Sequence, residues 1–414
     1  MERDSRWSLA DVGFAALLLL AAALVLYKCP FGFADSDEAF YLCVPHRLLQ
    51  GDALLAQEWN LSQLAGLLPL PLVWLYEALT GGTAGIVLAF RYGYAVFQIG
   101  VACWLYLCLR RVGRPGAGIA AVCYLLYTPF GIMAFSYNSL GLTHLLLALV
   151  LVATARERAA ARLALAGALL ATAVMCCPPL ALLYLLYSLA VAACALVRWA
   201  ERPYVLTARG WAWLTAGAAA VAALVAAFAL SRATPAQLWQ SLAHMLADPE
   251  HQPSGLGAML AGYGTAIYHS SAIAPRVYIA AGVLLGVLCL DRNRERNGWA
   301  YLCASAALAG ALLLYPLCTG KAYLNFAMFP LALCGPFAFL VRRDAVSRRI
   351  FYGLWLPGMV FTLCIHLASN QAYYAISSAG AVAAIGSVLL LARAAAAQTG
   401  RVKRPLALAC VCAL

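Results

Sequence analysis

Residues 9–28 read LADVGFAALLLLAAALVLYK, and apolar runs of this kind recur along the whole chain. A helix of about 20 apolar residues is long enough to cross the roughly 30 Å hydrocarbon core of a bilayer. Hydrophobic residues make up 65% of the 414 residues and charged residues only 11%, whereas soluble domains carry about 25% charged residues. Ala and Leu dominate the runs without strand-like alternation. The sequence therefore predicts an all-α, polytopic transmembrane helical bundle, not a β-barrel.

The first apolar run is expected to remain in the protein as a span. It is longer than the hydrophobic region of a typical signal peptide, and Tyr27-Lys28-Cys29-Pro30 does not resemble a small-residue cleavage site. At the other end the chain reads LALACVCAL after Pro405. Ten residues are too few to cross a bilayer, so we expect either an interfacial stub or, preferably, a chain truncated at 414 near the start of another span.

Basic residues form short clusters between the apolar runs. With the amino terminus in the cytoplasm, every cluster falls inside, and so do 22 of the 28 Lys and Arg residues. This bias satisfies the positive-inside rule, so the net charge of +12 needs no nucleic-acid partner. The topology is one transmembrane domain over 1–414 with about 12–13 spans and two long outer segments, 29–83 and 231–276. Twelve spans are assigned near 9–28, 84–109, 115–133, 140–155, 163–177, 180–197, 211–230, 277–290, 298–317, 324–341, 350–367 and 372–392.

Residues 62–80 read SQLAGLLPLPLVWLYEALT and are apolar enough to be mistaken for a span. Counting them as one would place the basic cluster at 110–114 outside and invert every later loop. Pro69 and Pro71 also interrupt the run. We therefore predict that this segment is a helix lying at the outer interface.

The first outer segment concentrates negative charge. It holds six of the sixteen acidic residues against one basic residue, and Asp35, Asp37 and Glu38 fall within four positions. Carboxylates packed this close either hold a proton between them or collect a cation, and both arrangements suit a site that takes a proton from a hydroxyl. The structural alternative is a capping box with Asp35 at the N-cap and Glu38 at N3. Asp37 has no role in such a capping box, so Asp37 is the expected catalytic carboxylate.

Neither the cysteines nor any cofactor motif points to a disulfide scaffold or a bound cofactor. Most of the fifteen cysteines lie within apolar runs, where Cys acts as a small hydrophobe. Only Cys29 and Cys43 share the first outer segment, which makes them the one candidate bridge. No zinc or haem motif and no GxxxxGK[ST] loop occurs. The sequence calls for no cofactor, although Asp35 and Asp37 could hold a divalent cation.

An ordered set of features follows the first span. An outer loop carries an Asp-Glu pair at 37–38 with the aromatic Tyr41 nearby, and a Leu-Leu-x-Gly-Asp turn comes at 48–52. A proline-bearing interfacial helix then ends in Gly-Gly at 81–82, and the second span has an early arginine, Arg91. This set resembles the GT-C superfamily of membrane glycosyltransferases, which includes the bacterial aminoarabinose transferase and the protein O-mannosyltransferases.

The resemblance covers residues 9–155 and implies transfer of a sugar from a polyprenyl-phosphate lipid to an acceptor on the outer face. It implies that Asp37 is the general base or the carboxylate that orients the acceptor, with Glu38 as its neighbour in the motif and Asp35 close by. Family members often carry a second Asp between the third and fourth spans, where this chain has Asn138. Asparagine can hold a hydroxyl or a metal-bound water but cannot act as a base. A changed donor or an inactive enzyme therefore stays open.

Residues 319–326, followed by Pro330, resemble a late loop of the family in which a basic residue and a tyrosine precede a proline-bearing span. Here these residues are Lys321 and Tyr323. Lys321 is one of the few positive charges on the outer side and could bind a lipid phosphate. It could equally extend its side chain to the outer headgroups.

Arg91 and His269 are further candidates for substrate binding. Arg91 lies about seven residues into its span, roughly 10 Å deep, and an arginine buried in a membrane needs an anionic partner. That partner is either a lipid phosphate or, structurally, Glu77 or Glu58. His269 lies in the second outer segment, where a solvated loop would explain it as well; the residues around Trp239 indicate an amphipathic interfacial helix.

The leading hypothesis is a glycosyltransferase of the cell envelope with an extracytoplasmic site. Compact loops and an arginine-rich, lysine-poor composition favour the bacterial plasma membrane. The partners are the lipid bilayer, a polyprenyl-phosphate-sugar donor and a glycan, lipid or protein acceptor; Asp37 takes the proton, and Lys321 or Arg91 stabilises the departing phosphate. Two alternatives stay open: a transporter or flippase for lipid-linked substrates, and a catalytically inactive scaffold. Spans nearly free of charge and the lack of an internal repeat argue against the transporter.

Overall fold

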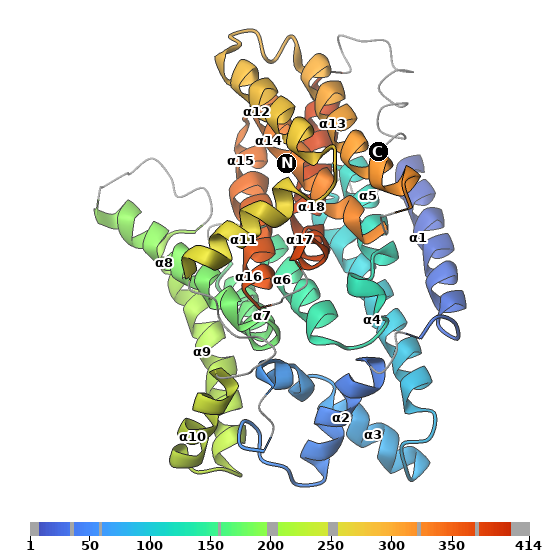
Figure 1. Ribbon diagram of the computed structural model, residues 1–414, viewed down its shortest axis with the longest axis vertical. Helices are drawn as coiled ribbons and strands as arrows, with labels where there is room; N and C mark the ends of the chain where they lie inside the picture. Colours follow the sequence, from blue (N-terminus) through green and yellow to red (C-terminus); the bar gives the residue numbers. More distant parts are fainter. Residues whose placement is uncertain are drawn as a thin grey trace.

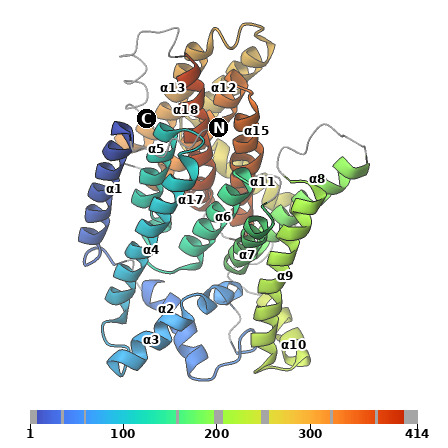
Figure 2. The same cartoon turned by 180° about the vertical axis from the view of Figure 1, so that it is seen from behind.

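The computed structural model of the chain describes residues 8–33, 37–57, 60–155, 159–196, 206–246, 256–320, 324–368 and 372–398. All regular secondary structure in these ranges is helical, which confirms the predicted fold class (Figures 1 and 2). The first half contains α1 (Leu9–Lys28), α2 (Asp37–Leu49), the 3-10 helix η1 (Leu61–Leu67), α3 (Leu70–Thr80), α4 (Ile86–Leu109), α5 (Arg114–Leu126), η2 (Pro129–Gly131), α6 (Tyr137–Ala153), α7 (Ala160–Cys176), η3 (Pro178–Leu180) and α8 (Ala181–Leu196). The second half contains α9 (Ala208–Leu230), α10 (Pro235–Leu246), α11 (Leu256–Tyr268), α12 (Ala274–Leu290), α13 (Gly298–Cys318), η4 (Leu324–Ala327), α14 (Met328–Val341), α15 (Ala345–Ile350), the π-helical turn η5 (Phe351–Trp355), α16 (Leu356–Ala368), α17 (Ala372–Ala379) and α18 (Ala381–Gln398).

Six helices of the described ranges are long and apolar enough to cross a membrane. They are Ala10–Lys28, Ile86–Leu109, Ala208–Leu230, Gly298–Tyr315, Ala345–Ala368 and Ala381–Gln398. Shorter apolar helices of 10–17 residues accompany them, among them α6, α7, α12 and α14. The long apolar helices are those of an integral membrane protein.

The segment at 62–80, predicted as one interfacial helix, is divided into two short helices. η1 ends at Leu67, and α3 begins after Pro69, whose ring removes a backbone donor and favours a helix start. α3 has 11 residues, which gives it a length of about 17 Å. It is therefore too short to cross a bilayer core of about 30 Å.

One end of the bundle, at the top of Figure 1, carries the loop between α12 and α13, and α1 begins toward the same end. Asp11, in the first turn of α1, is only 1% exposed. Its carboxylate accepts a hydrogen bond from the Tyr106 hydroxyl and forms an ion pair with Arg114 at 3.3 Å. Because Tyr106 and Arg114 flank the loop between α4 and α5, these bonds tie the start of α1 to that loop.

The last turns of α18 bind the same loop and two more at this end. Arg393 donates to the Val112 carbonyl at 2.8 Å and to the Asp344 carboxylate at 2.7 Å. Gln398 donates to the Glu295 carbonyl at 2.7 Å. The loops α4–α5, α12–α13 and α14–α15 therefore meet at α18, and we call this region the basic end.

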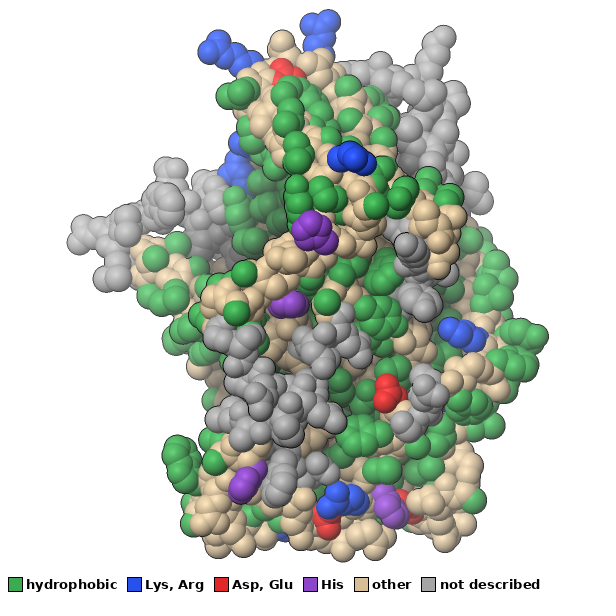
Figure 3. Space-filling view, viewed as in Figure 1, with side chains coloured by type: hydrophobic (Ala, Val, Ile, Leu, Met, Phe, Trp, Pro, Cys, Tyr) green, Lys and Arg blue, Asp and Glu red, His purple; other side chains and the backbone are tan. Residues whose placement is uncertain are grey.

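The opposite end, at the bottom of Figure 1, is built from α2, η1, α3 and α10. The Arg232 guanidinium donates to the carbonyls of Leu48 at 2.5 Å and Asp52 at 3.1 Å. These bonds join the segment after α9 to the loop after α2, so the two predicted outer segments lie together. Figure 3 shows acidic, basic and histidine side chains mixed at this end, and Lys and Arg side chains projecting from the other.

The core of the bundle lies around α18, which is buried along most of its length. It packs against α5, α14 and the η5 turn. Gly386 allows the backbone of Trp355 to approach, because a Cβ atom there would lie 3.1 Å from Trp355 Cα. The Trp355 indole in turn donates to the Ala332 carbonyl at 2.8 Å, so η5, α14 and α18 form one unit.

Two glycines bring α7 and α9 into direct backbone contact. A Cβ atom on Gly167 would lie 1.8 Å from the Leu214 carbonyl oxygen, and one on Gly217 would lie 1.8 Å from that of Ala164. Small residues at helix crossings are how membrane helices approach closely without a hydrophobic driving force between them. The reciprocal pair therefore sets the distance between α7 and α9.

We expect Gly217→Ala to lower the free energy of unfolding by about 1–3 kcal/mol, because the added methyl group must push the two backbones apart. Thermal unfolding in detergent measures the change. Gly100→Ala on α4 is the matched control, because a Cβ atom there meets nothing within 4 Å, and alanine is the better helix former. Equal destabilisation by both substitutions would show that the α7–α9 contact is not the cause.

Candidate functional site

The first turn of α2 separates its two carboxylates. The buried face of this helix carries Glu38, Leu42, Pro45 and Leu48, which recur at the spacing of one helical face. Glu38 is therefore turned into the protein and is 1% exposed. Asp37, one residue earlier, lies on a different face and is exposed.

Glu38 forms a buried ion pair with Arg91 of α4. Arg91 Nη1 donates to both carboxylate oxygens, at 2.8 and 2.9 Å, and the two side chains are only 1% and 2% exposed. The second guanidinium nitrogen donates to the Phe31 carbonyl at 2.6 Å, and the Phe33 ring lies 4.4 Å from the guanidinium carbon. The pair thus holds α4, α2 and the end of α1 together.

This ion pair corrects the structural partner expected for Arg91. The sequence suggested Glu77 or Glu58, but the carboxylate of Glu77 contacts His46 Nδ1 at 2.7 Å. Glu58 lies outside the described residues. The anion that neutralises Arg91 is therefore Glu38, which packing brings next to it.

The capping box predicted for this turn depends on Asp35 as the N-cap, and Asp35 lies outside the described residues, which resume at Asp37. Within the described residues, the Glu38 carboxylate is bound by Arg91 from another helix.

The charge of Asp37 acts on two phenols, Tyr41 of α2 and Tyr137 in the first turn of α6. The two rings meet edge to face, with centroids 5.5 Å apart at an angle of 80°. Burial, followed by the neighbouring Tyr137 and the Asp37 charge, raises the pKa of the Tyr41 hydroxyl. Both phenols therefore stay protonated at neutral pH and can donate hydrogen bonds.

Asn138 lies beside these phenols and is 9% exposed. Its side chain interacts with the Tyr137 oxygen. The turn that carries both residues is held by a capping box, in which the Ser136 hydroxyl accepts from the Ser139 amide at 3.0 Å. The structure thus brings Asp37, Tyr41, Tyr137 and Asn138 into one group, which we call the Asp37 group.

This group combines one exposed carboxylate with hydroxyl and amide side chains. A carboxylate can accept a proton, while phenols and an amide can orient a hydroxyl or an oxyanion. The sequence did not lead us to expect Tyr137 in the site. Its position next to Asn138, a predicted site residue, is the feature that could have indicated it.

The remaining predicted site residues lie elsewhere or are not described. His269, just after α11, is exposed and packs edge-on against Tyr268 with centroids 5.1 Å apart. None of its described contacts joins it to the Asp37 group. Asp35, Lys321 and Tyr323 lie outside the described residues.

Neither a disulfide nor a metal cluster occurs in the described part of the chain. Cys29 and Cys43 are free thiols, buried and exposed respectively. The Cys29 thiol contacts the Val25 carbonyl at 3.4 Å. No group of three or more His, Cys, Asp or Glu side chains among the described residues could hold a metal ion.

Comparisons with protein families, with curated proteins and with solved structures find no match to this chain. A functional assignment therefore depends on the chemistry and position of the Asp37 group.

Proposed function

We propose that this protein is an integral membrane glycosyltransferase that moves a sugar from a polyprenyl-phosphate donor to an acceptor hydroxyl. The observation that carries the proposal is that the two neighbouring carboxylates in the first turn of α2 have different surroundings. Glu38 is neutralised by Arg91 inside the protein, whereas Asp37 stays exposed beside Tyr41, Tyr137 and Asn138. A rigidly anchored turn that presents one accessible carboxylate suits a general base.

The orientation proposed for the chain has the basic end in the cytoplasm and the Asp37 group on the extracytoplasmic side. The gathering of the loops α4–α5, α12–α13 and α14–α15 at one end supports it, because basic loops are retained on the cytoplasmic side. We propose about 12–13 spans, a cytoplasmic amino terminus and a bacterial plasma membrane. The shorter apolar helices would supply the spans beyond the six long ones.

In the proposed reaction the acceptor oxygen forms a bond to C1 of the sugar while the bond between C1 and the phosphate oxygen breaks. The acceptor proton passes to Asp37, and the electron pair of the broken bond leaves on the polyprenyl phosphate. Asn138 and the phenols of Tyr41 and Tyr137 would orient the acceptor. Inversion at C1 follows from this single displacement.

Arg91 has a positioning role in this proposal. Reaching a donor phosphate would cost Arg91 its bonds to Glu38 and to the Phe31 carbonyl. Lys321 is the remaining candidate for stabilising the departing phosphate. The described residues offer no set of metal ligands around Asp37, so no step is assigned to a divalent cation.

The proposal is tested by incubating the purified full-length protein in proteoliposomes with radiolabelled polyprenyl-phosphate sugars and membrane extracts as acceptors. Covalent transfer of label to a lipid, glycan or protein supports a glycosyltransferase. Movement of label across the bilayer without a covalent product would establish the transporter instead. Saturable binding with neither product nor movement would establish an inactive scaffold, for which the asparagine at 138 is the motivating observation.

A further inference from the structure

A groove of ≈ 390 Å³ runs between α5, α13, α14 and α18, a volume in the range of sites for small ligands. Along α13 it extends from Trp299 to Leu313, a rise of about 21 Å for 14 residues. None of the described residues that line it is charged. The groove thus follows most of the depth of a bilayer core of about 30 Å with an apolar wall.

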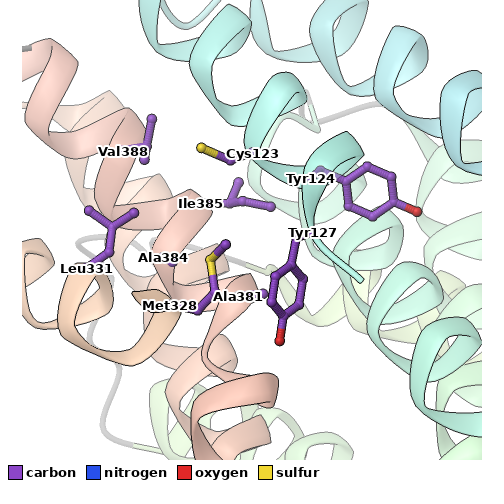
Figure 4. A pocket seen from close by; sticks show the side chains of 9 residues that line it. All are labelled: Cys123, Tyr124, Tyr127, Met328, Leu331, Ala381, Ala384, Ile385 and Val388. Atoms are coloured by element: carbon purple, nitrogen blue, oxygen red, sulfur yellow. The ribbon is translucent and has the colours of Figure 1, made fainter. Parts of the chain in front are cut away.

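The groove narrows where it meets α5. Cys123, Leu331 and Val388 belong both to its wall and to a second cavity of ≈ 10 Å³. Figure 4 shows the side chains from α5, α14 and α18, together with Tyr127 just after α5, that line this second cavity. Room for about one water molecule is too little for a continuing chain, so the groove is closed in this direction.

The wall of the groove carries one polar group without a partner. Trp299 Nε1 is buried and has no hydrogen-bond acceptor among the described residues. Trp299 is in the first turn of α13, directly after the loop of residues 291–297. Because Nε1 itself is buried, it is other atoms of the Trp299 indole that border the groove.

Arginines dominate the loops beside that end of the groove. Gln398 and Arg393 hold the loops 291–297 and 342–344 against α18, and Val388, Leu391 and Ala395 of the same helix line the groove. Residues 291–297, 342–349 and 393 contain eight arginines and three acids: Arg292, Arg294, Arg296, Arg342, Arg343, Arg348, Arg349 and Arg393, with Asp291, Glu295 and Asp344.

Two of the three carboxylates already have partners within the protein. Asp344 accepts from Arg342 at 2.6 Å and from Arg393 at 2.7 Å. Asp291 accepts from the Asn297 side chain at 2.9 Å, from the Asn293 backbone amide at 2.7 Å and from Tyr301 at 2.9 Å, and these bonds lower the pKa of Asp291 and keep it charged. Arg292 and Arg296 are exposed in the same loop, so the surface beside Trp299 is positively charged.

We propose that this groove binds one acyl chain of an anionic phospholipid from the leaflet at the basic end. The chain lies along α13 against the Trp299 indole, and Arg292 and Arg296 hold the phosphate. Basic pockets between membrane helices recognise anionic headgroups in this way. At the other end of the groove the described lining residues, Leu313 and Pro330, carry no charge. We therefore assign the phosphate to the arginine-rich loop at the basic end, and the site is distinct from the Asp37 group.

The test uses full-length protein in detergent, titrated with phosphatidylglycerol whose acyl chains are brominated, because bromine quenches the fluorescence of a nearby indole. We expect saturable quenching whose main component disappears in Trp299→Phe, and much weaker quenching by brominated phosphatidylcholine. Arg292→Ala combined with Arg296→Ala should weaken phosphatidylglycerol binding about 30-fold, from the contribution of two basic residues at an anionic headgroup. Equal affinity for both lipids would overturn the proposal.

Gly310→Leu tests the groove itself. A Cβ atom on Gly310 meets nothing within 4 Å, so a leucine can fill the groove without a clash at that atom, and the lipid-dependent quenching of Trp299 should be lost. Gly286→Leu, on the exposed side of α12 and also without neighbours within 4 Å, is the matched control and should bind as wild type. An unchanged Gly310→Leu variant would contradict the proposal, as would displacement of the lipid by polyprenyl phosphate at lower concentration.

Discussion

Arg91→Ala is expected to lower the free energy of unfolding by about 3–5 kcal/mol, the cost of leaving one member of a buried ion pair without its partner. The Glu38 carboxylate would lose both guanidinium bonds, and the Phe31 carbonyl would lose its donor. Since both side chains of the pair are at most 2% exposed, water cannot readily replace these contacts. Thermal unfolding in detergent, followed by the appearance of aggregated protein, measures the loss.

A double variant separates the lost pair from lost packing. Arg91→Met combined with Glu38→Leu removes both charges and keeps the volume, so it should be more stable than either single change. Arg47→Ala is the matched control, because its pair with Asp52 is exposed, with 46% and 29% of the side-chain surfaces accessible. Exposed pairs contribute about 1 kcal/mol or less. If Arg91→Ala and Arg47→Ala had equal effects, the buried pair would not anchor α2.

Asp37→Asn is expected to lower the rate of sugar transfer about 10²–10⁴-fold, the usual contribution of a positioned general base. The amide keeps the size of the side chain but cannot take the acceptor proton. Because Asp37 is exposed, the substitution should change stability by about 0.5 kcal/mol or less. Initial rates of label transfer at saturating donor, measured beside unfolding temperatures, separate chemistry from folding.

Asp52→Asn is the control for this prediction. Asp52 lies in the same outer layer and carries the same charge, but it is paired with Arg47 at 2.6 Å and belongs to the loop after α2. It should retain nearly wild-type transfer. A wild-type rate for Asp37→Asn, or equal losses in the two variants, would remove Asp37 from the catalytic role.

The helical architecture followed from local properties of the sequence. Each predicted span overlaps a helix of the structure, because the length and apolarity of a run decide whether it can satisfy its backbone inside a bilayer. The prolines at 69 and 71 likewise mark the place where the segment predicted as one helix divides into η1 and α3. Both features depend on a few neighbouring residues, so no knowledge of the packing was needed.

The partners of polar residues depended on contacts between distant parts of the chain. Arg91 pairs with Glu38 across 53 positions, and sequence alone favoured Glu77 or Glu58 as structural partners. The helical geometry of α2 determines this pairing, since adjacent residues on a helix point in different directions and only Glu38 faces α4. For the same reason Asp37 is exposed, so the two neighbouring carboxylates have different surroundings.

The sequence by itself determined that this chain is a helical membrane protein with basic residues between its apolar runs, because hydropathy and charge act through short segments. Only the tertiary structure decided that Arg91 neutralises Glu38 while Asp37 is exposed. It also decided that α5, α13, α14 and α18 leave a groove between them. Such features arise where helices far apart in the chain come into contact. Their geometry depends on how side chains pack, which no single segment specifies.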